Sequence, residues 1–94
     1  MNVIFTEAAL ADLDDVLAVA SEHYPTAAGA LEHRIRAVVA RIADWPESAR
    51  MIAQDQHIRA VPLVRYPFTI FYRLSGDHLE ILHIHHSARE TPWE

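Results

Sequence analysis

A proline at position 25 divides the first half of the chain into two segments with helical periodicity. Apolar residues recur at steps of three and four on both sides of it: Leu10, Leu13, Leu17, Ala20 and Tyr24 before it, and Ala28, Leu31, Ile35, Val38, Ile42 and Trp45 after it. Proline disfavours the helical conformation of the residue before it, so Tyr24 ends the first helix. Thr6 is a suitable N-cap for the first helix and Thr26 for the second, which Pro46 closes. These residues predict a helical hairpin.

The remaining segments alternate between apolar and polar residues with the period of two that is typical of strands. Strands are expected at residues 3–5, 57–65, 68–74 and 78–85, with a tight turn at Ser75-Gly76-Asp77 joining the last two. In the segment 57–65, Arg59 and Arg65 fall on one face, and Pro62 indicates an edge strand or a bulge.

The predicted element order is β-α-α-β-β-β, and the helical hairpin returns the chain to the end of its first strand. We therefore predict one α+β domain over residues 1–94, with the hairpin packed on one face of a mainly antiparallel sheet. Two helices cover only one face, whereas the third predicted strand carries Ile70 and Tyr72 on one face and Phe71 on the other. We expect the second face to be available for a binding partner.

Composition excludes several classes of protein and of site. The 94 residues leave room for one domain, and the absence of Cys removes disulfides, thiolate metal sites and cysteine nucleophiles. The net charge is -5 and all eight basic residues are Arg, which argues against a protein that holds nucleic acid by bulk charge, and we expect no direct sequence-specific binding of nucleic acid. No segment resembles a signal peptide or approaches the roughly 20 apolar residues of a membrane span, so we expect a cytoplasmic protein without a membrane partner.

A run of histidines near the C-terminus is the densest unusual feature. His83 and His85 share one face of the last predicted strand, whereas His86 points to the other. Two histidines could hold zinc or nickel if a carboxylate joined them, but the sequence contains no HExxH motif or acidic cluster. We therefore expect no metal and no cofactor, and histidines that are hydrogen-bonded at the end of a sheet are an equally good interpretation.

Arginines gather in the C-terminal half, at positions 50, 59, 65, 73 and 89. Guanidinium groups with one or two histidines could hold a phosphodiester and cleave it by acid–base chemistry without a metal. The candidates for such a nuclease site are Arg59, Arg65, His83 and His85. In the alternative interpretation each arginine is a solvated strand residue paired with a carboxylate such as that of Glu80.

Five segments of the sequence match a known family: Ala8–Leu13, Tyr24–Ala28, Pro46–Arg50, Val64–Arg73 with its Tyr-Pro-Phe, and Ile81–Arg89 with its terminal His-x-x-Arg. On these segments the chain resembles the RelE/ParE superfamily of toxins from bacterial type II toxin–antitoxin operons, and specifically its ParE branch. The resemblance implies a RelE/ParE-like fold and a compact toxin, which a ParD-like antitoxin neutralises by wrapping its C-terminal segment over the helices and sheet. We expect the antitoxin to contact Arg59, Leu63, Arg65, Phe71 and Arg73.

The resemblance implies one of two targets. ParE-like members poison DNA gyrase and block replication, whereas RelE-like members cut messenger RNA in the ribosomal A site. RelE-like nucleases tend to be basic and to use a late Tyr or His, but this chain is acidic, has no Lys and lacks a late Tyr. These departures favour gyrase inhibition, with His86, Ser87, Arg89 and Trp93 as the toxicity determinants. The alternatives are a metal-independent, ribosome-dependent endoribonuclease and a non-toxic interaction module.

Overall fold

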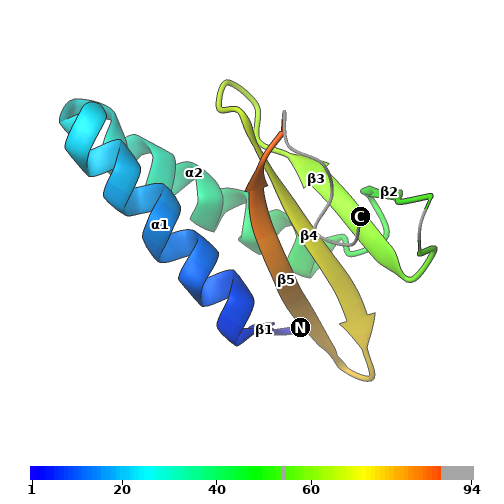
Figure 1. Cartoon of the computed structure of the whole chain (residues 1–94). Helices are drawn as coiled ribbons and strands as arrows, with labels where there is room; N and C mark the ends of the chain where they lie inside the picture. The colour runs from blue at the N-terminus through cyan, green and yellow to red at the C-terminus, as the bar shows by residue number, and fades with distance from the viewer. Residues whose placement is uncertain (54, 88–94) are drawn as a thin grey trace.

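The computed structural model of the chain describes residues 1–53 and 55–87. Its elements are β1 (Asn2–Phe5), α1 (Glu7–His23), α2 (Pro25–Asp44), β2 (Arg50–Met51), β3 (Ile58–Pro62), β4 (Phe68–Ser75) and β5 (His78–His86). The strands form one sheet in the order β1-β5-β4-β3-β2, with the two helices packed against it (Figure 1). β1 is parallel to β5, and the other neighbours are antiparallel. The predicted α+β fold is confirmed.

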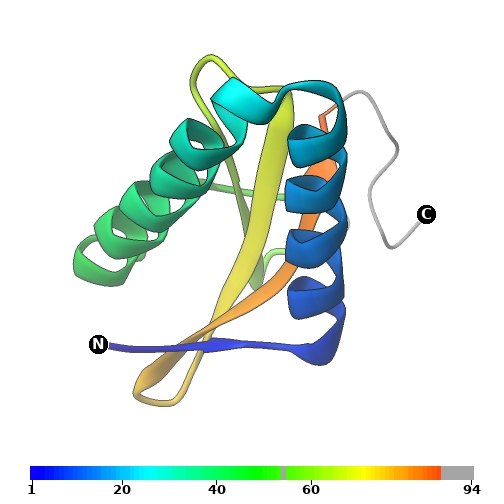
Figure 2. The same ribbon diagram turned by 90° about the vertical axis from the view of Figure 1, so that its left-hand side faces the viewer.

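Local chemistry sets the limits of both helices. The hydroxyl oxygen of Thr6 accepts a hydrogen bond from the backbone N–H of Ala9 (3.1 Å), which confirms Thr6 as the N-cap of α1. α1 ends at His23, and Pro25 is the first residue of α2, a position where a missing N–H costs nothing. Thr26 therefore lies inside α2 and the prediction that it caps this helix is wrong. Figure 2 shows how the two helices diverge from the turn that joins them.

The β3 strand is shorter than the alternating pattern predicted, because it ends at Pro62. β2, which the sequence pattern did not reveal, pairs with Arg59 and Ala60 only, so Pro62 lies where β3 has no neighbour on that side. Beyond it the chain turns, and Arg65 adopts a left-handed conformation with φ of 77°. The prediction that Arg59 and Arg65 share a strand face is therefore wrong.

A β-bulge between β4 and β5 determines which side chains of β5 face the helices. Phe71 pairs with His83 and Tyr72 with Ile81, which leaves Leu82 as the extra residue. In a regular strand Ile81 and Ile84 would point to opposite faces, but the bulge allows both to join the main core, where they are 0% and 2% exposed.

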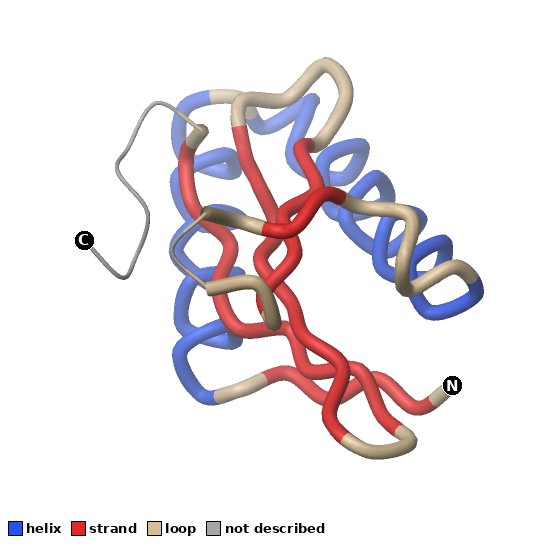
Figure 3. Tube along the Cα trace, turned by 90° about the vertical axis from the view of Figure 1, so that its right-hand side faces the viewer, coloured by secondary structure: helices blue, strands red, loops and turns tan. Residues whose placement is uncertain are grey.

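Apolar side chains are buried on both faces of the sheet. The main core lies between sheet and helices and contains the fully buried Tyr72 and Ile42. On the other face, which is turned to the viewer in Figure 3, a smaller cluster joins Phe71 to Ile52, Ile58 and Ala60. Phe71 is only 6% exposed. The expectation of an open apolar second face is therefore not met at the centre of the sheet.

Neither α1 nor α2 combines the length and the apolar composition that a membrane crossing requires, and no other helix occurs in the described part of the chain.

Candidate functional site: a carboxylate and two histidines between α1 and β5

At the edge of β5 that faces away from β4, the C-terminal half of β5 runs alongside α1 instead of alongside a second strand (Figures 1 and 2). β1 stops at Phe5, which is paired with Ile81, and the chain then turns into α1. The Thr6 hydroxyl marks this turn, since it lies 3.2 and 3.1 Å from the carbonyl oxygens of Ile81 and Leu82. α1 therefore borders the part of β5 that follows Leu82.

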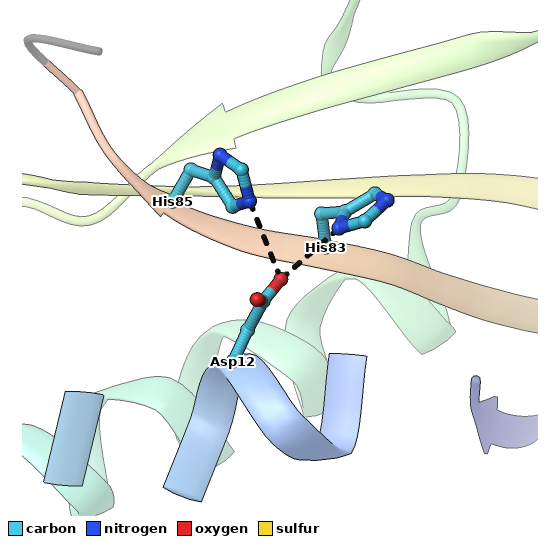
Figure 4. Close-up of side chains that lie close together, drawn as sticks. All are labelled: Asp12, His83 and His85. Atoms are coloured by element: carbon cyan, nitrogen blue, oxygen red, sulfur yellow. Dashed lines mark hydrogen bonds and ion pairs between the residues drawn. The ribbon is translucent and has the colours of Figure 1, made fainter. Parts of the chain in front are cut away.

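Asp12 projects from α1 toward this part of β5 and meets two histidines (Figure 4). Its Oδ2 atom accepts a hydrogen bond from the backbone N–H of Ile84 at 3.0 Å. The same oxygen lies 3.1 Å from Nδ1 of His83 and 3.6 Å from Nε2 of His85. One carboxylate oxygen is thus shared by a strand amide and two imidazoles.

The cluster of Asp12, His83 and His85 is partly accessible to solvent. The side chains of Asp12, His83 and His85 are 22%, 26% and 23% exposed. The two imidazole rings contact each other edge to face, with 5.2 Å between their centres and an angle of 75° between their planes. A carboxylate and two imidazoles in this arrangement can orient an imidazole, hold a proton or ligate a cation.

Sequence reasoning placed His83 and His85 together but missed Asp12, which lies 71 residues from His83. Asp12 is one of several acidic residues outside the apolar stripe of its helix, where a solvated side chain is the ordinary interpretation. The signal that could have found it is topological. Parallel pairing of β1 with β5 places the start of α1 beside the C-terminal half of β5.

Arg59 lies elsewhere and binds the segment that follows α2. Its guanidinium donates hydrogen bonds to the carbonyl oxygens of Glu47 (3.1 Å) and Ala49 (2.7 Å). The neighbouring hydroxyl of Tyr72 donates to the carbonyl of Pro46 (2.7 Å). Burial raises the pKa of Tyr72, and the positive charge of Arg59 opposes this rise. Arg59 therefore has a structural task here.

Arg65 and Arg73, the other two arginines predicted to contact the antitoxin, are also separate from the histidines. Arg65 is exposed and lines a groove of about 460 Å³ against α2, together with His33 and Arg34. Arg73 donates to Glu80 at 2.7 Å, as the solvated-pair interpretation predicted. Of the predicted nuclease residues Arg59, Arg65, His83 and His85, the structure brings together only the two histidines.

The predicted toxicity determinants begin at the end of β5. The His86 ring contacts the ring of Phe68 edge to face, at 5.6 Å between centres. Ser87 donates its backbone N–H to the carbonyl of Pro67 (2.7 Å), and its hydroxyl lies 2.9 Å from that of Thr69. His86 and Ser87 are both exposed. Arg89 and Trp93 lie outside the described residues.

Two of the residues predicted to contact an antitoxin, Leu63 and Phe71, are 4% and 6% exposed in this structure and contribute to its cores. A more accessible apolar surface lies between the helices, in a groove of about 310 Å³. Its lining residues are Phe5, Leu10, Leu13, Glu32, Ile35, Arg36, Val39 and Ala40. Leu10 is 49% exposed there, and an ion pair between Glu32 and Arg36 (3.6 Å) borders the groove.

Comparisons with known proteins agree with this architecture. The family model described as the ParE toxin of the type II toxin-antitoxin system parDE matches residues 3–91. A Sinorhizobium fredii (strain NBRC 101917 / NGR234) protein named as a toxin, Y4kP, is 33% identical over 91 residues, which cover 97% of this chain and 93% of that protein. A solved chain titled as the chromosomal ParDE TA system from P. aeruginosa is 25% identical, with a TM-score of 0.78 over 92% of this chain and 95% of that one. The present chain belongs to the ParE toxin family of type II toxin–antitoxin systems.

Proposed function

We propose that this toxin acts in the cytoplasm by binding and inhibiting DNA gyrase, which blocks replication, and that it is not a nuclease. The observation that carries the proposal is the dispersal of the candidate catalytic groups. Arg59 is bound to backbone carbonyls and is separated from the two histidines on β5 by β4, whereas Arg65 lines a groove against α2. Phosphodiester cleavage requires such groups to converge on one phosphate.

The charge of the molecule supports the same choice. The net charge is -5, and no Lys is present to steer the chain toward ribosomal RNA. A protein that acts by occupying a surface of gyrase needs neither a catalytic constellation nor bulk positive charge. Membership of the ParE family adds the expectation, stated above from the resemblance, that gyrase is the target.

A supercoiling assay tests the proposal directly. Purified toxin is added to gyrase, ATP and relaxed plasmid, and we expect loss of supercoiled product and accumulation of cleaved plasmid. Trp93→Ala and Arg89→Ala should each reduce the potency. Trp45→Ala is the matched control, since Trp45 is 69% exposed but follows α2 in the sequence and is not one of the predicted toxicity determinants. Full supercoiling at saturating toxin would refute a gyrase target.

We also propose that a ParD-like antitoxin neutralises the toxin by placing apolar side chains in the groove between α1 and α2. The groove is lined mainly by apolar residues, and the half-exposed Leu10 offers area that a partner helix could bury. Of the residues predicted from the sequence to contact the antitoxin, Arg65 and Arg73 are the two that are exposed.

The antitoxin proposal is tested with a ParD-like antitoxin, which we expect the adjacent reading frame to encode. Leu10→Asp places a charge in the groove and should weaken antitoxin binding at least about tenfold, because burial of an unpaired charge is costly. Met51→Asp, at a position 51% exposed on β2, is the matched control. If the two variants bind the antitoxin with equal affinity, the antitoxin does not bind in this groove.

One observation favours the ribonuclease as a second candidate: the 3.1 Å contact between Asp12 and Nδ1 of His83 could orient that imidazole for proton transfer. Ribosome-programmed messenger RNA distinguishes the two functions. Under the gyrase proposal the message stays intact. Cleavage by the unmodified toxin that is lost in an Arg65→Ala, His85→Ala double variant would instead establish the nuclease.

A further inference from the structure

We propose that Asp12, His83 and His85 form a binding site for a divalent transition-metal ion, with Zn²⁺ as the preferred ion. Two histidines alone are too few ligands for a metal site, and the fold supplies a carboxylate from α1 to join them. This inference is independent of whether gyrase is the target of the toxin.

The separations of the donor atoms fit a zinc ion. One potential ligand atom from each of Asp12, His83 and His85 lies within 4.8 Å of the other two. With zinc–ligand distances near 2.0–2.1 Å, two ligands at a tetrahedral centre are about 3.3 Å apart. The distances from Oδ2 of Asp12, 3.1 Å to Nδ1 of His83 and 3.6 Å to Nε2 of His85, lie on either side of this value.

The donors are held by rigid elements and can be reached from solvent. His83 and His85 are two residues apart on β5, and Asp12 is held by the hydrogen bond from the Ile84 amide. Such an orienting hydrogen bond is a regular feature of metal-binding carboxylates. Between one fifth and just over one quarter of each side chain is exposed, which leaves a fourth coordination position for water.

The chemistry of the donor set selects among cations. Two imidazoles and one carboxylate suit zinc and other divalent first-row metals, whereas Mg²⁺ and Ca²⁺ prefer sites made of oxygen donors. A groove of about 480 Å³ that includes Asp12 and His85 is also lined by Asp15 and Glu22. These carboxylates lower the electrostatic cost of bringing a cation to the cluster.

A bound ion would join α1 to β5 by coordination in addition to packing. An unfolded chain brings Asp12 and His83 together only by closing a loop of 71 residues, so an ion held by both binds the folded state preferentially. Zinc should therefore raise the melting temperature of the full chain, and this readout does not depend on toxicity.

Isothermal titration of untagged, chelator-treated full-length protein with ZnCl₂ tests the site. We expect one Zn²⁺ per chain, a rise in melting temperature with added zinc, and no binding of Mg²⁺ at the same concentrations. Asp12→Asn keeps an oxygen that can accept the Ile84 amide but removes the anionic ligand, and should weaken zinc binding about 100-fold or more. His85→Gln removes a ligand without touching that hydrogen bond, so a folding defect in one variant leaves the other informative.

His78→Gln is the matched control. His78 lies on the same strand beside two carboxylates, Asp77 at 3.7 Å and Glu80 at 4.0 Å, but is not part of the three-residue cluster. This variant should bind zinc as the original protein does. The proposal is overturned if the original protein binds no zinc, or if Asp12→Asn and His85→Gln bind it as tightly as His78→Gln does.

Discussion

The hydroxyl of Tyr72 donates a hydrogen bond of 2.7 Å to the carbonyl oxygen of Pro46 and so connects the centre of the sheet to the chain that leaves α2. Tyr72 itself is 0% exposed, and Arg59 binds carbonyl oxygens of Glu47 and Ala49 in the same segment. Together the two side chains fix the path by which the chain passes from helix to strand.

Replacement of Tyr72 by Phe keeps the buried ring and removes only the hydroxyl. The carbonyl of Pro46 then loses its donor, and the free energy of unfolding should fall by about 1 kcal/mol. Urea denaturation followed by circular dichroism measures the change. Tyr24→Phe is the control, because Tyr24 is 67% exposed and its variant should unfold at the midpoint of the original protein.

The same phenol makes stability depend on pH at the alkaline end. Burial raises the pKa of Tyr72 above its usual value of 10.0, although Arg59 opposes the shift. Above pH 10.0 the unfolded chain releases this proton before the folded chain does, so the unfolded state binds fewer protons. The contribution of the neutral phenol to the free energy of unfolding is therefore fully present below the pKa of Tyr72 in the unfolded chain. It is lost as the pH rises through the pKa of Tyr72 in the folded chain.

Denaturation midpoints measured on both sides of pH 10.0 should therefore show a steeper alkaline loss of stability in the original protein than in Tyr72→Phe. Parallel pH profiles for the two proteins would contradict this assignment.

The two threonines at the helix starts should differ in their effect on stability. Thr6→Ala removes the hydroxyl that caps α1 and should cost about 1 kcal/mol of unfolding free energy. Thr26 is exposed within the first turn of α2, so Thr26→Ala should change stability by less than about 0.5 kcal/mol. Equal losses in the two variants would mean that Thr26 contributes to capping after all.

The two glycines form a second matched pair. A Cβ atom would meet nothing within 4 Å at either Gly29 or Gly76, so that only backbone conformation distinguishes them. Gly76 turns the β4–β5 hairpin with φ of 62°, and Gly76→Ala should lower stability by about 1 kcal/mol. Gly29 lies inside α2, where Gly29→Ala should raise stability by up to about 1 kcal/mol. The melting temperature should therefore fall for Gly76→Ala and rise for Gly29→Ala.

Features set by neighbouring residues were predictable from the sequence. Thr6 caps the helix that follows it, Pro25 separates the two helices, and Gly76 turns the last hairpin, because each effect acts over only a few residues. The face of the sheet on which a strand residue lies was less predictable. Leu82 forms a bulge and Arg65 lies past the end of β3, and in both cases pairing with another strand decides where alternation stops.

The candidate site was predictable only in part for the same reason. His83 and His85 share a side because they are two residues apart, which is a local relationship. Asp12 joins them through the parallel pairing of β1 with β5, and nothing in the residues around Asp12 indicates that contact. The structural role of Arg59 could not be predicted, because its partners are backbone carbonyls, which leave no pattern in a sequence.

The position of α1 beside β5 also affects how copies of this chain meet one another. A strand that extends past its neighbour presents free amide and carbonyl groups, on which a strand of a second molecule can add and start an aggregate. Here α1 covers that stretch of β5, and the carboxylate of Asp12 accepts a hydrogen bond from the amide of Ile84. At the opposite edge of the sheet, β2 is only two residues long. A sheet protected in this way favours recognition by a dedicated partner over self-assembly through its strands.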